Sequence, residues 1–354
     1  MADEYLEALA NEIKFYLNGE KHPMRTIFVG GGTPTALNLR QLEYLLQLID
    51  QHMDVVNVEE YTFEANPGDL NEDKIKLLRD YGVNRISMGV QSFDNQLLED
   101  LGRLHRVNDV EENINHLLKH GLTNISIDLM YGLPNQTIEI FDDSIERALA
   151  FDLPHYSTYS LQIEPKTVFY QRHQKGKLHK PPEEVEASMF ELLIDKMKRN
   201  GKYQYEVSNF AEPGFESKHN LTYWDNQYYY GFGAGASGYL PGERHINLRP
   251  FPAYVKAANE SGRPVLHIDQ IGKKEQVEEE LFLGLRKRTG VSKADFKTKY
   301  KLDLHNVYQK PIKELIDRGW LEEDDQRIRM TEQGQLFGNE VFQRFLLDEF
   351  EFDD

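Results

Sequence analysis

The sequence predicts an α/β protein, in which a parallel β/α domain of the barrel kind is followed by a small helical domain. Short apolar, β-rich runs alternate about five times with amphipathic stretches, which is the pattern of parallel β/α units. The runs read as apolar on both faces, as buried parallel strands do. The chain has 354 residues, enough for one large barrel-type domain and one small domain.

The individual elements follow from local patterns. Residues 39–52 carry four apolar side chains at helical spacing, and Gly82 ends the helical pattern 71–82 where a C-cap glycine belongs. The segment "YQYEVSNFA" at 203–211 predicts a further strand. The runs that predict the barrel strands are 25–31, 60–66, 85–92, 124–133 and 155–163.

Changes in composition suggest three regions. We expect a barrel-like domain over 1–200, a β extension with glycine-rich segments over 201–270, and a winged-helix-like domain over 271–354. In the last region the pattern predicts helices around one short strand. The acidic end "DEFEFDD" at 348–354 is typical of a solvated tail.

Composition limits the function. The formal net charge of −18 disfavours nonspecific binding of nucleic acid or anionic membranes, because such a surface repels phosphates. The sequence contains no long apolar run and no signal-peptide pattern, so we expect a cytoplasmic protein. It contains no cysteine, which excludes disulfides, thiolate metal sites and cysteine nucleophiles within these residues.

Polar residues and bare backbone follow the predicted strands where a parallel barrel places its binding site. Carboxylates at the mouth of a barrel need partners, and a cationic ligand such as an amine meets that need. Taken singly, Glu64 or Asp128 could instead anchor a loop, and the glycines could simply form a tight turn. The residues at these strand ends are Gly31, Gly32, Thr33, Glu64, Gln91, Asp128 and Gln162.

Five motifs in order resemble the radical S-adenosylmethionine proteins of the oxygen-independent coproporphyrinogen III oxidase group: "FVGGGTPT", "FEANPGDL", "RISMGVQSF", "LGRLHR" and "IDLMYGLPNQT". The resemblance implies a partial (β/α)6 radical-SAM barrel. It also implies that S-adenosylmethionine is held at its methionine end by Gly31, Gly32 and Thr33, with Glu64, Gln91, Arg103, Asp128 and Gln162 lining the rest of the pocket. Arg103 would pair with the methionine carboxylate; the alternative is an arginine on a surface helix.

This group has two branches, and "HNLTYW" at 219–224 resembles a motif of the haem chaperones. That resemblance implies haem contact by His219, Asn220, Tyr223 and Trp224, with His219 as a candidate iron ligand. The alternative is a loop histidine beside core aromatic residues. The implied function is haem binding and transfer to haem-accepting proteins, membrane-associated respiratory ones among them.

The sequence leaves two other functions open. One is an enzyme like oxygen-independent coproporphyrinogen III oxidase, acting in porphyrin biosynthesis. The other is a winged-helix nucleic-acid binder, which the acidic balance disfavours. The motif at 219–224 favours the chaperone over both.

The sequence departs from the family at one decisive motif. The family holds a [4Fe–4S] cluster with C-x-x-x-C-x-x-C, and this sequence has no cysteine. We therefore expect no cluster on these residues and no radical catalysis by them. Residues 3–13 resemble the helix that follows the cluster loop, so we expect the first barrel strand to be missing, through truncation or as a natural variant.

Overall fold

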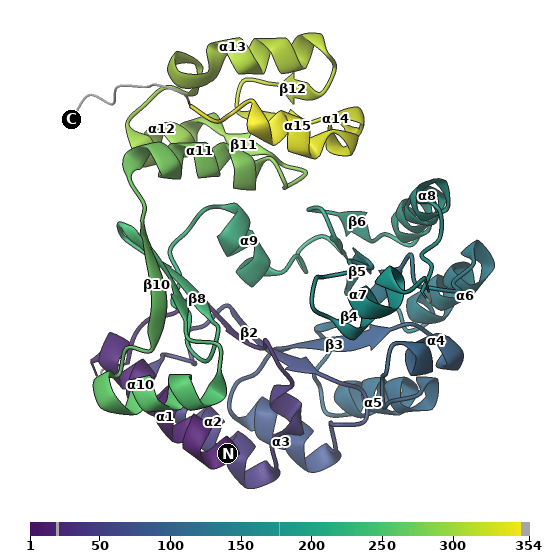
Figure 1. Cartoon of the computed structure of the whole chain (residues 1–354), viewed down its shortest axis with the longest axis vertical. Helices are drawn as coiled ribbons and strands as arrows, with labels where there is room; N and C mark the ends of the chain where they lie inside the picture. The colour runs from purple at the N-terminus through teal and green to yellow at the C-terminus, as the bar shows by residue number, and fades with distance from the viewer. Residues whose placement is uncertain (19–20, 177, 348–354) are drawn as a thin grey trace.

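The computed structural model describes residues 1–18, 21–176 and 178–347. Its main sheet has seven strands in the order β1-β2-β3-β4-β5-β7-β6 (Figure 1). The first five strands run parallel, and β7 lies antiparallel to β5. All five predicted barrel strands are confirmed; they are β1 (Thr26–Val29), β2 (Glu60–Ala65), β3 (Arg85–Gln91), β4 (Ile125–Tyr131) and β5 (His155–Ser160).

Helices pack against one face of this sheet, and local signals set their ends. The helix over 39–52 begins at an Asn38–Gln41 capping box. The helix that Gly82 was expected to end does so: Gly82 has φ +87°, and the N–H of Val83 donates to the carbonyl of Leu78 at 3.1 Å. The helices are α1 (Ala2–Leu17), α2 (Leu39–His52), α3 (Glu72–Asp80), α4 (Asn95–Asp100), α5 (Val107–Lys119), α6 (Ile138–Leu149), α7 (Val168–Gln174) and α8 (Glu183–Arg199).

The expectation that the strands are apolar on both faces is wrong. Tyr61 and Phe63 are fully buried in the core beneath the helices. The alternate positions carry polar side chains that share the other face, because successive strand residues point to opposite sides. In register, Glu64 lies beside Ser87 and Asp128 lies beside Ser157. The barrel-type sheet therefore has an apolar outer face and a polar inner face, and the inner face carries the candidate site.

The middle region differs from its prediction in one element. Residues 203–211 form a hairpin of two short strands, β6 (Tyr203–Gln204) and β7 (Asn209–Ala211), in place of one strand. The chain reverses because the Tyr205 N–H donates to the Asn209 carbonyl at 3.1 Å. The remaining elements are α9 (Lys218–Trp224), α10 (Phe251–Ser261) and an antiparallel sheet of β8 (Ser237–Leu240), β9 (Glu243–Asn247) and β10 (Val265–Gln270).

The glycine-rich segment 228–239 is fixed to the first helix. Glu12 of α1 is fully buried and accepts hydrogen bonds from the Gly233 N–H at 2.8 Å and the Tyr254 hydroxyl at 2.6 Å. A buried carboxylate needs such donors. The contact ties α1, the glycine-rich segment and α10 into one unit.

The C-terminal region has its own hydrophobic core, formed by residues between 277 and 345. It contains a three-stranded antiparallel sheet in the order β11-β13-β12, so the expected single strand is wrong. The predicted tail at 348–354 lies outside the described residues. The elements are α11 (Lys273–Gly284), β11 (Val291–Ser292), α12 (Lys293–Tyr300), α13 (Leu304–Asp317), β12 (Leu321–Glu323), β13 (Arg327–Met330), α14 (Glu332–Leu336) and α15 (Gly338–Gln343).

The short helix α9 connects the two bodies. Figure 1 shows it between the main sheet and the C-terminal domain, and it contacts both β1 and α11. None of the described helices is long and apolar enough to cross a membrane.

Candidate functional site

The loop after β1 lies directly on Glu64. The Gly31 N–H donates to Glu64 Oε2 at 2.9 Å, and Gly31 has φ +83°. A side chain at Gly30 would place Cβ 2.4 Å from the Glu64 carboxyl carbon and 2.6 Å from the Phe28 ring. Glycine is therefore required at position 30 for close approach and is favoured at 31 by its backbone conformation.

An asparagine joins this loop to Arg103. The Asn66 side chain donates to Thr33 Oγ1 at 3.0 Å and accepts from Arg103 Nη2 at 2.8 Å. Arg103 also donates to the Gly89 carbonyl at 2.8 Å. It lies in the loop after α4 and is partly buried, so the alternative of an arginine on a surface helix is wrong. Sequence reasoning left Asn66 out of the site, although its place in "FEANPG" directly after a strand was a usable signal.

Two carboxylates in this region have no cation of the described chain within ion-pair distance, and Asp128 interacts with Arg85 and Arg103 only at longer range. Burial raises the pKa of Asp128 to about 7, against hydrogen bonds from Ser157 and Ser87 that lower it. Burial also raises the pKa of Glu64, which the Gly31 N–H partly offsets. Neither carboxylate takes part in an ion pair among the described residues. Glu64 does anchor the loop, but the pair also forms an acidic surface that a cationic ligand would stabilise.

Most of the predicted pocket residues are brought together at the carboxyl ends of the parallel strands. Gln91 has φ +69° and lies with Arg103 beside Gly89, where a Cβ would come within 3.1 Å of both side chains. Gln162 is exposed after β5, and among the described residues no side-chain hydrogen bond joins it to the group. The residues brought together are Gly31, Thr33, Glu64, Gln91, Arg103 and Asp128, with Gly32 exposed at the rim.

The HNLTYW motif lies at the opposite ends of the same strands, and it forms α9. Ser217 caps this helix, with Oγ accepting from the Asn220 N–H at 3.3 Å. Glu60, the first residue of β2, accepts from the N–H groups of Lys218 at 2.8 Å and His219 at 3.0 Å. His219 therefore lies on a helix and not in a loop, although it does pack beside an aromatic residue, Phe28. Glu60 was missed by sequence reasoning, because nothing local shows that it reaches a helix 158 residues away.

Both ring nitrogens of His219 have hydrogen-bond partners. Nδ1 lies 2.9 Å from Thr26 Oγ1, and Nε2 lies 2.8 Å from the Tyr223 hydroxyl. The Phe28 ring stacks on the imidazole with centroids 5.0 Å apart. Burial lowers the pKa of His219 to about 4, so the imidazole is neutral at neutral pH. A neutral imidazole is the form that ligates a metal.

The last two motif residues face a cavity. Tyr223 and Trp224 line a cavity of about 480 Å³, which the β8–β9 hairpin and α11 complete. Tyr223 also packs edge-on against Tyr229 at 4.7 Å. The motif therefore joins the polar inner face of the sheet, through His219, to an aromatic cavity at the C-terminal domain.

The donor set does not fit an iron–sulfur cluster. The sequence offers no thiolate, and within the described residues no group of three His, Asp or Glu side chains could hold a metal ion. The strand-end residues do fit a ligand that carries both positive charge and a carboxylate. Two carboxylates that form no ion pair within the described chain suit the positive charge, and a guanidinium, a side-chain amide and the backbone of the glycine loop suit the polar groups.

Comparisons with known proteins bear on both regions. Residues 3–148 match the radical SAM superfamily, and residues 271–337 match the HemN C-terminal domain. The protein named heme chaperone HemW of Bacillus subtilis is 47% identical in sequence to this chain. The match covers 97% of this chain and 91% of the relative's length. The HemW of Lactococcus lactis is 48% identical over 99% of this chain and 91% of its own length.

A solved structure gives the same fold. Coproporphyrinogen III oxidase (HemN) from Escherichia coli, described as a radical SAM enzyme, superposes with a TM-score of 0.84 at 22% identity, covering 98% of this chain and 83% of that one. Such low identity shows the shared fold alone. The identity of 47–48% to the curated relatives, over nearly the full length of both chains, shows the family as well as the fold. The predicted resemblance is confirmed: the chain belongs to the HemW family within the radical SAM superfamily.

Proposed function

We propose that this protein binds haem and passes it to haem-accepting proteins. The observation that carries the proposal is α9, which holds a half-buried neutral histidine at one end and turns two aromatic side chains into a cavity at the other. Haem needs an iron ligand and flat apolar contacts, and aromatic rings supply the latter. The curated relatives bear the name heme chaperone.

The geometry defines what iron ligation by His219 requires. Its Nε2 is engaged by the Tyr223 hydroxyl, so an iron atom would take the place of that hydroxyl. The Thr26 hydroxyl at Nδ1 would then fix the orientation of the ring, as second contacts of metal-bound histidines do. Asn220 contributes its N–H to the Ser217 cap and so supports the helix that presents the motif.

We infer that the strand-end pocket holds S-adenosylmethionine. By family resemblance, Gly31, Gly32 and Thr33 would hold its methionine end, and Arg103 its carboxylate. Burial raises the pKa values of Glu64 and Asp128, and the ammonium and sulfonium of this ligand would stabilise their charged forms. When bound, S-adenosylmethionine supplies a positively charged sulfonium group. The residues present do not fit the cluster that cleaves it in the family, so the pocket is proposed for binding only.

The coproporphyrinogen oxidase alternative has less support from this chain. Likeness to HemN extends to the fold, and the chemistry of that enzyme branch depends on thiolate-bound iron–sulfur. The haem-associated motif at 219–224 and the curated relatives both favour the chaperone. The acceptors, their membrane association and a cytoplasmic location are part of the same proposal.

Titration with haem, followed by Soret absorbance, tests the proposed function. We expect saturable binding at micromolar haem and a clear loss with His219→Ala. His267→Ala is the matched control, because His267 is an exposed histidine on β10 that pairs with the neighbouring Asp269, far from α9 in the sequence. No Soret shift for the wild-type protein, or equal loss in both variants, would contradict the proposal.

A further inference from the structure

The cavity beside α9 has a composition that fits one class of ligand. Its walls carry the aromatic rings of Tyr223, Trp224, Tyr229, Tyr239 and Phe282. Flat conjugated ligands bind well between such rings. The same cavity is lined by one arginine and one glutamate, which are described next. It is therefore an aromatic slot with a charged edge.

The charged edge is an ion pair between two parts of the fold. Arg244 of β9 contacts Glu279 of α11 in a bidentate manner, with Nη1–Oε1 at 2.6 Å and Nη2–Oε2 at 2.9 Å. The Arg244 guanidinium also lies 4.7 Å from the centre of the Tyr239 ring. Both side chains keep partial solvent access, at 29% and 21% exposed. A ligand carboxylate could thus replace the Glu279 carboxylate on a guanidinium already held against a ring.

A second guanidinium packs on aromatic rings that line the slot. Arg286 lies over the rings of Trp224 at 5.5 Å, Phe282 at 4.7 Å and Phe342 at 4.8 Å. Burial lowers its pKa, and no ion pair of Arg286 occurs among the described residues. Two of the rings that it contacts, those of Trp224 and Phe282, line the cavity, so a second positive charge lies behind its aromatic lining.

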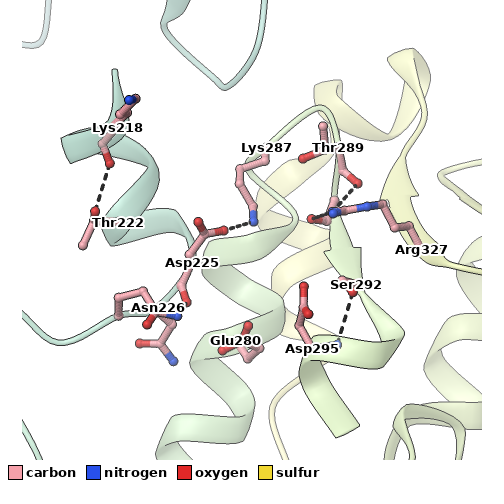
Figure 2. Close-up of polar contacts among 12 residues, drawn as sticks. Lys218, Thr222, Asp225, Asn226, Glu280, Lys287, Thr289, Ser292, Asp295 and Arg327 are labelled. Atoms are coloured by element: carbon pink, nitrogen blue, oxygen red, sulfur yellow. Dashed lines mark hydrogen bonds and ion pairs between the residues drawn. The ribbon is translucent and has the colours of Figure 1, made fainter. Parts of the chain in front are cut away.

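The C-terminal domain is fastened to α9 at the base of this cavity. Lys287 pairs with Asp225, directly after the motif, as Figure 2 shows. Lys299 donates to the Asn226 carbonyl at 2.6 Å and to Glu280 at 2.7 Å. These contacts hold α11, and with it Glu279 and Phe282, in place against the motif. The C-terminal domain is therefore a wall of the site.

We propose that this interdomain cavity binds the porphyrin ring of haem, and that Arg244 exchanges Glu279 for a propionate carboxylate of the ligand. The inference rests on the proposed haem function and adds the location and the carboxylate recognition. Because Glu279 belongs to the C-terminal domain, each exchange loosens one contact between that domain and the hairpin. Haem release and re-formation of the Arg244–Glu279 pair are then coupled, because the propionate and Glu279 compete for the same guanidinium.

Metal-free protoporphyrin IX tests the inference without any contribution from iron ligation. Binding to the full-length chain is followed by porphyrin fluorescence anisotropy for the wild type, Arg244→Gln and Glu279→Gln. We expect Arg244→Gln to bind about tenfold more weakly, through loss of a charge-assisted pair, and Glu279→Gln to bind more tightly, because a competitor is removed. Arg263→Gln is the matched control, since Arg263 pairs with Glu243 on the same antiparallel sheet outside the cavity lining.

The dimethyl ester of protoporphyrin gives a readout that does not depend on the folding of any variant. The wild type should bind the diacid more tightly than the ester, and Arg244→Gln should narrow that difference. Equal binding of diacid and ester by the wild type, or unchanged diacid binding by a folded Arg244→Gln, would overturn the inference. If haem still binds in a His219-dependent manner in that case, the proposed function stands and only this site is wrong.

Discussion

Replacement of Glu60 by glutamine should loosen the motif helix without touching the motif. Glu60 is 4% exposed, and its two carboxylate oxygens accept from three donors at the start of α9: the Ser217 hydroxyl, the Lys218 N–H and the His219 N–H. A glutamine side chain keeps one acceptor oxygen. If the amide oxygen of the glutamine takes the place of Oε1, it can still accept from Ser217 and His219. The amide NH₂ group then faces the Lys218 N–H, and because both are donors, that hydrogen bond is lost.

The magnitude follows from the bonds lost. A hydrogen bond to a charged group contributes about 1.5–3 kcal/mol, so losing one such bond should destabilise α9 by about 2 kcal/mol. Local opening of the helix would then become roughly 30-fold more frequent, at about 1.4 kcal/mol per factor of ten. Glu60→Ala removes all three acceptor contacts and should have a larger effect.

Native-state amide hydrogen exchange measures this opening directly. The readout is the exchange rate of peptides that cover residues 217–225, with the outer helices as an internal reference. Glu322→Gln is the control, because Glu322 is exposed and pairs with Arg329 on the C-terminal sheet, away from α9. If exchange in α9 is unchanged in folded Glu60→Gln, the carboxylate does not hold the helix, and the reasoning fails.

Three further predictions concern the two ends of the sheet. Burial lowers the pKa of His219 from 6.5 to about 4, so the unfolded state takes up the proton first as the pH falls. The stability contributed by the neutral imidazole is full well above pH 6.5 and is lost as the pH falls toward 4. Between pH 7 and 5 the wild type should lose about 2 kcal/mol more unfolding free energy than His219→Gln in urea titrations. Because the pKa of Asp128 is raised to about 7, S-adenosylmethionine should bind about tenfold more tightly at pH 8 than at pH 6 by calorimetry, and an equal pH dependence in Asp128→Asn would contradict this. Gly30→Ala should destabilise the protein by about 1–3 kcal/mol in urea, because its Cβ meets Glu64, whereas Gly32→Ala faces open space and serves as control.

Much of the fold followed from the sequence. The five parallel strands and the glycine that ends α3 depend on residues close together in the chain, because periodicity and turn preferences act over a few residues. The glycine loop after β1 and the carboxylate at Glu64 were also predicted, since the carboxyl ends of parallel strands meet at one edge. Their direct hydrogen bond confirms that they lie together.

Other features depended on the tertiary structure. The sequence alone did not show that Glu60 caps α9, that Thr26 and Tyr223 occupy both nitrogens of His219, or that Arg244 and Glu279 close a cavity beside Trp224. These contacts join positions far apart in the chain. Their geometry is set by how helices and sheets pack, which no local pattern encodes. The sequence by itself determined the strands, the motifs and the family resemblance, and packing decided which side chains meet.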